Sequence, residues 1–326
     1  MPLDAPRFWQ RDQRNAFLAR ALSPVGEIYH QIVQRRLSKP GAEPPCPVIC
    51  VGNATVGGVG KTPFVRMLTK SLRERGHEAH VLTRGYGGKE KGTRRVTEDD
   101  AAALVGDEPL MLAQDLPVWV SADRPAGAEA AARDGATLIV MDDGFQNPSL
   151  KKTLSLMLVD GDTLFGNGRV FPAGPLREKP EAAAARADAI VAVLPGPEAE
   201  TPPELARLAG GKPLFRAWFA IDRTSIPEGP ILAFCGIGRP ERFSRSLEEA
   251  AAKPIKFLTF PDHHSFTEGE IAALRVEATA AGAQLVTTEK DYIRLEPAAR
   301  DGITAIRGAT QVDDRDRLLR LVEDRR

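Results

Sequence analysis

The chain has 326 residues, enough for two domains of ordinary size, and its 42% hydrophobic and 27% charged residues are typical of a globular protein. Lys and Arg together number 44, as do Asp and Glu, so no excess of positive charge indicates a nucleic-acid partner. The three cysteines, Cys46, Cys50 and Cys235, fit neither a zinc-binding spacing nor a disulfide framework, and there is no long apolar run or signal peptide, which together indicate reduced thiols in a cytoplasmic protein.

Residues 1–40 differ from the rest of the chain because they combine basic with apolar side chains. From Leu18 onward the apolar residues recur at intervals of three and four, which predicts a helix with one apolar face. Ser23 and Pro24 are typical of a helix start, so we expect two helices that meet there. A basic amphipathic helix suits an anionic membrane surface, but the same pattern also fits a helix packed on the protein's own core.

The strongest motif in the chain is a glycine-rich segment at 55–62. It follows an apolar run at 47–51 that predicts a buried strand, and it precedes a helical pattern at 64–72. This order is that of a phosphate-binding loop, in which backbone N–H groups and a helix N-terminus face phosphate oxygens. The expected nucleotide-binding residues are Thr55, Val56, Gly57, Gly58, Val59, Gly60, Lys61 and Thr62.

Two side chains at the end of this segment have expected roles. Lys61 is expected to neutralise the β- and γ-phosphates, and the Thr62 hydroxyl is expected to ligate Mg²⁺. The usual loop begins with glycine, whereas Thr55 stands at that position here. The alternative interpretation is a glycine turn before an ordinary helix.

Charged residues follow the next expected strands. A strand at 80–83 precedes Arg84 in a glycine-rich segment, and a strand at 118–120 precedes Arg124. Ligands bind at the carboxyl ends of strands in α/β sheets, so both arginines are candidates for contact with substrate or phosphate. A solvated loop is the alternative for Arg84. Asp107 stands before an apolar helical pattern, where it is either a helix-capping residue or a catalytic carboxylate.

A second strong signal is the stretch 137–144, in which an apolar strand ends in Asp142 and Asp143. Downstream of a phosphate loop, this pattern matches the strand that delivers a carboxylate to Mg²⁺, so both are candidate metal ligands. A strand at 154–159 and a loop rich in glycine and proline follow. Arg177 in that loop is a candidate for contact with an anionic substrate.

The remaining strands are expected at 187–194, 214–221, 230–235 and 284–288. Between the last two lie His263 and His264, beside Asp262, which could be metal ligands, an acid/base pair or part of a polar loop. The residues alone favour the polar loop. The segment 303–306 is expected to run back as a strand beside 214–221, and a short charged helix ends the chain.

Several of these segments occur together, and in this order, in one family. They are Gly52-Asn53, Val56–Pro63, Arg84–Gly87, Val105–Pro109, Asp142–Gln146, Pro172–Glu178, Phe260–His263 and Thr288–Asp291. From about residue 48 to 295 the chain resembles tetraacyldisaccharide 4'-kinase, which phosphorylates the 4'-hydroxyl of the disaccharide precursor of lipid A. The threonine at the first loop position is typical of that family.

The resemblance implies an α/β fold of the P-loop NTPase type, with a mostly parallel sheet between helices, and a smaller α/β domain joined by a hinge of two strands. The expected parts are membrane-associating helices at 1–40, a kinase domain at 41–221, the smaller domain at 222–302, and a return strand and helix at 303–326. It also implies ATP and Mg²⁺ as cofactors, and a peripheral location on the cytoplasmic face of the bacterial inner membrane. No obligate protein partner is evident.

The resemblance also implies roles for two residues far apart in the sequence. Asp107 is the expected base on the sugar hydroxyl, assisted by His263 from the second domain, with Lys61 and Arg124 stabilising charge on the γ-phosphoryl group. The main alternative is a membrane-associated ATPase of the partitioning or metal-delivery type. Such proteins carry a lysine where Val56 stands here, which argues against them. A nucleotide-gated lipid-binding or scaffold protein is a further alternative, and it would not need Asp107 and His263.

Overall fold

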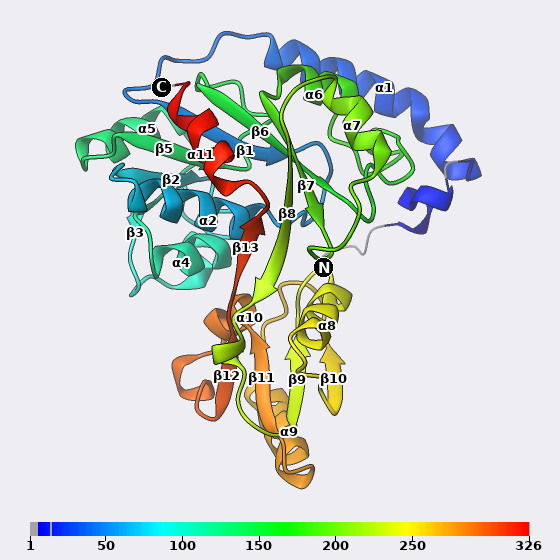
Figure 1. Ribbon diagram of the computed structural model, residues 1–326, viewed down its shortest axis with the longest axis vertical. Helices are drawn as coiled ribbons and strands as arrows, with labels where there is room; N and C mark the ends of the chain where they lie inside the picture. The colour runs from blue at the N-terminus through cyan, green and yellow to red at the C-terminus, as the bar shows by residue number, and fades with distance from the viewer. Residues whose placement is uncertain (1–5, 14, 326) are drawn as a thin grey trace.

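The computed structural model describes residues 6–13 and 15–325, so parts of the expected segments 1–40 and 303–326 lie outside the described residues. Most of this chain forms a unit around one large sheet (Figure 1). Its strands are β1 (Val48–Asn53), β2 (Ala79–Thr83), β3 (Thr93–Val96), β4 (Val118–Ser121), β5 (Leu138–Asp142), β6 (Leu154–Asp160), β7 (Ala189–Leu194), β8 (Leu214–Ile221) and β13 (Gly308–Val312). Within the described residues this nine-stranded sheet has the order β13-β8-β7-β6-β1-β5-β2-β4-β3.

The inner strands are parallel, and antiparallel strands stand at the two edges. β1 is buried along its whole length between β5 and β6, as its uninterrupted apolar sequence predicts. Its side chains alternate between two cores, with Ile49 and Val51 on one face and Val48 and Cys50 on the other. The prediction of a mostly parallel sheet with strands at the expected positions is confirmed.

Helices cover both faces of this sheet (Figure 1). On one face lie α2 (Lys61–Glu74), α4 (Asp107–Ala113) and α11 (Arg315–Glu323), and on the other lie α5 (Arg124–Arg133), α6 (Pro180–Arg186) and α7 (Pro203–Ala209). A single turn, α3 (Ala102–Val105), precedes α4. The basic run after β2 is not only a loop, because its last residues form β3 at the sheet edge.

The smaller unit contains a four-stranded parallel sheet in the described chain. Its strands are β9 (Ile231–Cys235), β10 (Lys256–Thr259), β11 (Gln284–Thr288) and β12 (Ile303–Ile306), and its helices are α8 (Pro240–Glu249), α9 (Glu268–Ala280) and α10 (Glu289–Arg294). The strand order is β10-β9-β11-β12. Short 3₁₀ turns complete the described chain at Arg7–Trp9, Arg11–Gln13, Arg223–Ser225 and Pro297–Ala299.

The prediction that 303–306 pairs with 214–221 is wrong. These residues form β12, which runs parallel to β11, and it is the next segment, β13, that runs antiparallel to β8. β8 and β13 lead from the large sheet towards the smaller unit (Figure 1). Gly308 at the start of β13 allows this approach, because a Cβ there would lie 2.4 Å from the Phe219 ring.

The prediction of two helices that meet at Ser23 and Pro24 is also wrong, because one helix, α1 (Phe17–Leu37), runs through both residues. A proline inside a helix removes one backbone N–H donor, and here it is tolerated at an exposed position. The hydroxyl of Ser23 instead donates to the Ala19 carbonyl, 2.7 Å away. The pair Ser23-Pro24, which is typical of a helix start, therefore lies inside one longer helix.

Ion pairs join the two units. Asp160 is buried at the end of β6, and its carboxylate pairs with Arg239 and Arg242 of the smaller unit. Its other oxygen accepts backbone N–H groups of Asp162 and Thr163, each at 3.0 Å. The same carboxylate therefore closes a turn in one unit and holds two cations of the other.

We expect Asp160→Asn to lower the free energy of unfolding by about 1.5–3 kcal/mol, because hydrogen bonds to charged groups contribute that much and the NH2 group of the neutral amide would face either the guanidinium donors or the backbone N–H donors. The control is Asp162→Asn, whose exposed pair with Arg245 spans 3.4 Å and is expected to contribute less than about 1 kcal/mol. Urea unfolding measures both variants. Equal losses would contradict a special role for Asp160.

Candidate active site

The phosphate-binding loop lies between the end of β1 and the start of α2. Gly57 and Gly60 have φ values of 112° and 89°, a conformation that favours glycine. A Cβ added at Gly57 or Gly58 would meet nothing within 4 Å, so the concave side of the loop is open. The N-terminus of α2, a helix of 14 residues, begins at this loop and contributes positive partial charge.

A second loop holds this first one in place. The Val56 N–H donates to the Pro175 carbonyl, and the Arg177 N–H donates to the Ala54 carbonyl, each at 2.7 Å. Asn53, at the end of β1, donates to the carbonyl and to the hydroxyl of Thr55, each at 3.0 Å. Thr55 therefore replaces the usual glycine with a side chain that fixes the start of the loop.

Lys61 lies between Asn53 and Asp143. Its Nζ donates to Asn53 Oδ1 at 3.0 Å and lies 3.5 Å from Asp143 Oδ1, which also accepts from Arg177 Nη1 at 2.8 Å. Burial alone would raise the pKa of Asp143, but the positive charges of Lys61 and Arg177 lower it below its usual value. Asp143 is therefore an anion that orients two cations at the loop.

Asp142 and Thr62 form the adjacent part of the site. The Thr62 hydroxyl lies 3.1 Å from Glu108 Oε2 and 3.4 Å from Asp142 Oδ2. Asp142 is 3% exposed, and burial, followed by the charge of Glu108, raises its pKa to about 7. Its Oδ1 is buried without a hydrogen-bond partner among the described residues, as is typical of an atom that awaits a ligand.

These residues fit a magnesium ion that a nucleotide brings with it. Mg²⁺ is usually held by one or two carboxylates together with substrate phosphates and water. In the described ranges no group of three His, Cys, Asp or Glu side chains is arranged to hold a metal alone. Thr62 and the unpaired oxygen of Asp142 suit such a shared ion, whereas Asp143 already contacts Lys61 and Arg177.

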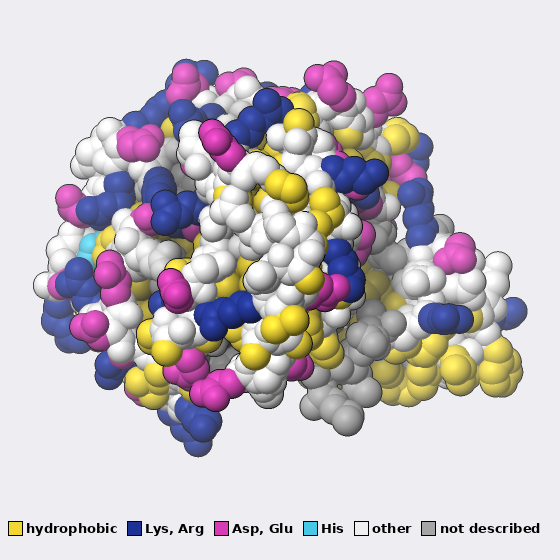
Figure 2. Space-filling view, turned by 90° about the horizontal axis from the view of Figure 1, so that it is seen from below, with side chains coloured by type: hydrophobic (Ala, Val, Ile, Leu, Met, Phe, Trp, Pro, Cys, Tyr) yellow, Lys and Arg dark blue, Asp and Glu magenta, His cyan; other side chains and the backbone are white. Residues whose placement is uncertain are grey.

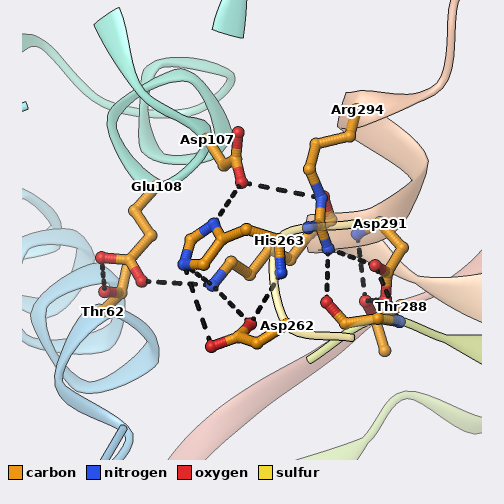
Figure 3. A network of polar contacts seen from close by, with 10 residues as sticks. Thr62, Asp107, Glu108, Asp262, His263, Thr288, Asp291 and Arg294 are labelled. Carbon is orange, nitrogen blue, oxygen red and sulfur yellow. Dashed lines mark hydrogen bonds and ion pairs between the residues drawn. The ribbon is translucent and has the colours of Figure 1, made fainter. Parts of the chain in front are cut away.

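Asp107 and His263 lie together although 155 residues separate them in the sequence. Asp107 is the first residue of α4 in the large unit, and His263 comes from the smaller one, with Nδ1 3.0 Å from Asp107 Oδ2 (Figure 3). Burial acts to raise the pKa of Asp107, but the hydrogen bond with His263 and the charge of Arg294 outweigh it and lower the pKa. His264 instead contacts Glu270 at 3.0 Å and stacks on Phe260.

The three candidate arginines differ in accessibility. Arg84 is exposed, and Arg177 is half-buried against Asp143. Arg124 is only 2% exposed, and its Nη1 donates to the Ser121 carbonyl at 2.6 Å. Burial lowers the pKa of Arg124, and its Nε is buried without a partner in the described chain, so a contact with substrate needs local rearrangement.

The structure adds residues to the site that the sequence did not single out. Glu108 contacts Thr62, Asn53 contacts Lys61, and Gln146 donates to both the Asn53 carbonyl and Glu178. Each stands next to a recognised motif residue or inside a recognised segment. Their position next to motif residues was the only sequence feature that could have identified them. The structure shows which of their atoms are in contact.

A strand, a glycine-rich loop and a helix N-terminus at the carboxyl edge of a mostly parallel sheet define a P-loop nucleotide-binding protein. The model of the family described as "LpxK: Tetraacyldisaccharide-1-P 4'-kinase" matches residues 18–325. The chain belongs to this family, the tetraacyldisaccharide 4'-kinases of lipid A biosynthesis.

Individual relatives agree with this assignment. The tetraacyldisaccharide 4'-kinase of Phenylobacterium zucineum is 48% identical over 314 residues that cover 93% of each chain. That of Caulobacter vibrioides is 46% identical over 315 residues, again 93% of each chain. A crystal structure of LpxK from Aquifex aeolicus, described as an "apo" form in complex with ATP, covers 95% of this chain and 99% of its own, with a TM-score of 0.75 and 30% identity.

We expect Lys61→Ala to weaken binding of a nucleoside triphosphate by about ten- to a hundredfold, because it removes a charged donor worth roughly 1.5–3 kcal/mol. Calorimetric titration with MgATP measures the change. The control is Lys70→Ala on the same helix, since Lys70 pairs with Asp115 at 2.9 Å and does not contact the loop. Unchanged affinity in the Lys61 variant would contradict the assigned role.

Proposed function

We propose that this chain transfers the γ-phosphoryl group of ATP to the 4'-hydroxyl of the tetraacyldisaccharide 1-phosphate precursor of lipid A. The observation that carries the proposal is the contact of Asp107 with His263 next to the phosphate-binding loop. Glu108, the neighbour of Asp107, contacts Thr62 at the start of α2, so the carboxylate and the loop belong to one site. ATP as the donor is supported by that loop and by the ATP complex of the Aquifex relative.

In the proposed reaction Asp107 is the base. A sugar hydroxyl is a weak nucleophile, and a positioned base contributes roughly 10²- to 10⁴-fold to the rate. The hydroxyl oxygen forms a bond to the γ-phosphorus, the bond from that phosphorus to the bridging β–γ oxygen breaks, and the hydroxyl proton passes to Asp107. ADP and the 4'-phosphate are the products, and His263 orients the carboxylate by its hydrogen bond.

The other residues of the site bind and orient the nucleotide. Lys61 and the N-terminus of α2 neutralise phosphate charge, and Arg177, Arg84 and Arg124 are proposed to contribute further positive charge. Mg²⁺ supplies charge neutralisation at the phosphates when it is bound, and Thr62 and Asp142 are the residues proposed to hold it, with Asp143 beside them. Because Asp107 and His263 come from two units, the site is complete only when the units are together.

We further propose that α1 lies on the membrane surface from which the lipid is taken. Its bulky apolar side chains point to solvent, with Phe17 82% and Ile28 60% exposed, while Ala19 and Gly26 are buried. Figure 2 shows apolar side chains gathered on the side of the molecule on which α1 lies in Figure 1. Arg20, Arg35 and Arg36 add basic charge, which suits the anionic cytoplasmic face of the inner membrane. None of the described helices is both long and apolar enough to span a bilayer.

The direct test of the proposed reaction is transfer of label from [γ-³²P]ATP to the purified lipid A precursor, with the position of the phosphate in the product determined. Label on the 4'-oxygen supports the proposal. Hydrolysis of ATP with no labelled lipid would support instead an ATPase of the partitioning or metal-delivery type.

We expect Asp107→Asn to lower kcat for lipid phosphorylation by about a hundredfold or more while the affinity for MgATP stays within about threefold, because the amide cannot take the proton. Label transfer and calorimetry measure the two quantities. Asp99→Asn, a change of the same chemistry at an exposed residue, is the control. Full turnover by the Asp107 variant would remove this residue from the mechanism.

We expect Ile28→Glu to reduce binding to anionic phospholipid vesicles by at least about tenfold, because burial of an isoleucine side chain contributes roughly 1.5–3 kcal/mol. Gln31→Glu is the matched control, since it adds the same charge at another exposed position of α1. Vesicle sedimentation measures both. If the two variants bind equally well, the contact with the bilayer lies elsewhere.

A further inference from the structure

Helix α10 of the smaller unit lies against α4 of the large unit and carries charged residues across the boundary. Glu289 accepts from Arg66 of α2 at 3.0 Å, and Lys290 lies 3.7 Å from Glu108. Arg294 lies 3.6 Å from Asp107. The segment Thr288–Asp291 is one of those that carry the family resemblance, but the sequence assigned no function to its residues. Three contacts of one short helix, made by Glu289, Lys290 and Arg294, place it at the site.

Lys290 also contacts the histidine of the site. Its Nζ lies 3.3 Å from Nε2 of His263, while Nδ1 of the same ring lies 3.0 Å from Asp107 Oδ2. An ammonium group has three N–H donors and no lone pair, so it can only donate. Nε2 must therefore be the acceptor of this contact, and a protonated Nε2 would face another donor.

This contact favours one tautomer of His263, because the Lys290 ammonium at 3.3 Å lies closer to Nε2 than the Asp262 carboxylate, whose Oδ2 is 3.9 Å away. When Nε2 carries the lone pair, the ring proton is on Nδ1, and Nδ1–H donates to Asp107 Oδ2. In the other tautomer Nδ1 would present a lone pair to a carboxylate, and the two would repel. Within the described chain, Asp107 Oδ1 accepts no hydrogen bond and points away from His263 (Figure 3), which leaves it for a substrate hydroxyl.

The surroundings hold Lys290 where this contact requires it. Glu108 and Asp262 flank its ammonium group at 3.7 and 3.8 Å, so the lysine bridges carboxylates of both units. One helical turn later, Arg294 is fixed by the fully buried Asp291 and by the Gly236 carbonyl at 2.8 Å. The backbone of α10 is thus anchored inside its own unit, and Lys290 reaches out from it.

We propose that Lys290 is a positioning residue for phosphoryl transfer, which fixes His263 in the tautomer that donates a hydrogen bond to Asp107. The inference rests on the proposed function, in which Asp107 is the base. Lys290 touches neither reacting group and acts through His263. His263 and Lys290 both belong to the smaller unit, so Asp107 is oriented in this way only when that unit contacts the large one.

The first test is kinetic. Lys290→Met is expected to lower kcat for lipid phosphorylation by about 10- to 100-fold, part of the contribution of a positioned base, with KM for ATP changed less than about threefold. Lys290→Arg keeps a charged donor without acceptors, so it is expected to recover most of kcat. Lys253→Met, at an exposed lysine of the same unit, is the control and is expected to keep full activity.

The second test reads the tautomer directly and does not depend on activity. The chain has five histidines, and ¹⁵N labelling of their rings, with His263→Gln to assign the signal, reports which nitrogen carries the proton. We expect Nδ1–H in the unmodified protein and a shift of the population towards Nε2–H in Lys290→Met. A thermal scan of each variant checks that it is folded.

The possible outcomes distinguish failure of the proposed kinase function from failure of the proposed role of Lys290. If the unmodified protein transfers no label to the lipid A precursor, the proposed function fails. If it transfers label, and Lys290→Met keeps both full kcat and the Nδ1–H tautomer of His263, the inference about Lys290 is overturned. A loss of kcat in Lys290→Met and Lys290→Arg alike, with an unchanged tautomer, would assign Lys290 a structural role and would also overturn it.

Discussion

The hydrogen bond between Asp107 and His263 is the interaction on which the rest of the structure depends. Asp107 begins helix α4 of the large unit and His263 lies in a loop of the smaller one, so 3.0 Å between their side chains requires that the two units keep their relative position. The paired strands β8 and β13 connect the sheets, while ion pairs on either side of the site hold them together. A carboxylate and the imidazole that it contacts are thus divided between the two units.

The nucleotide side of the site is organised differently, within one unit. β1, its loop and α2 follow one another in the chain, and the loop is held by backbone hydrogen bonds from the segment around Pro175. Asn53 and Asp143 of the same unit hold the side chain of Lys61 beside the loop. Such preorganisation reduces the rearrangement needed when phosphate binds. The contact of Asp107 with His263 depends on the smaller unit, whereas the contacts of Lys61 lie within the large one.

The sequence predicted the parts of this protein whose signals are local. Apolar strands, the glycine-rich loop and the acidic end of β5 each depend on a few consecutive residues, and all lie where expected. The pairing of β12 and β13 was not predictable, because both are short strands and their partners lie far away in the chain. Nor was the burial of Arg124 or the contact of Lys290 with His263, since both depend on how segments distant in the sequence pack together.

The distribution of small and large side chains around α1 has a consequence for the behaviour of the protein in water. Its small residues face the protein, and a Cβ at Gly26 would lie only 2.7 Å from the Val170 carbonyl, so the helix cannot turn its large side chains inward. The apolar stripe therefore persists whether or not a bilayer is nearby. A stripe of that kind favours self-association in plain buffer, and amphiphiles such as detergent would cover it. Storage and concentration of the purified protein should be designed around this property.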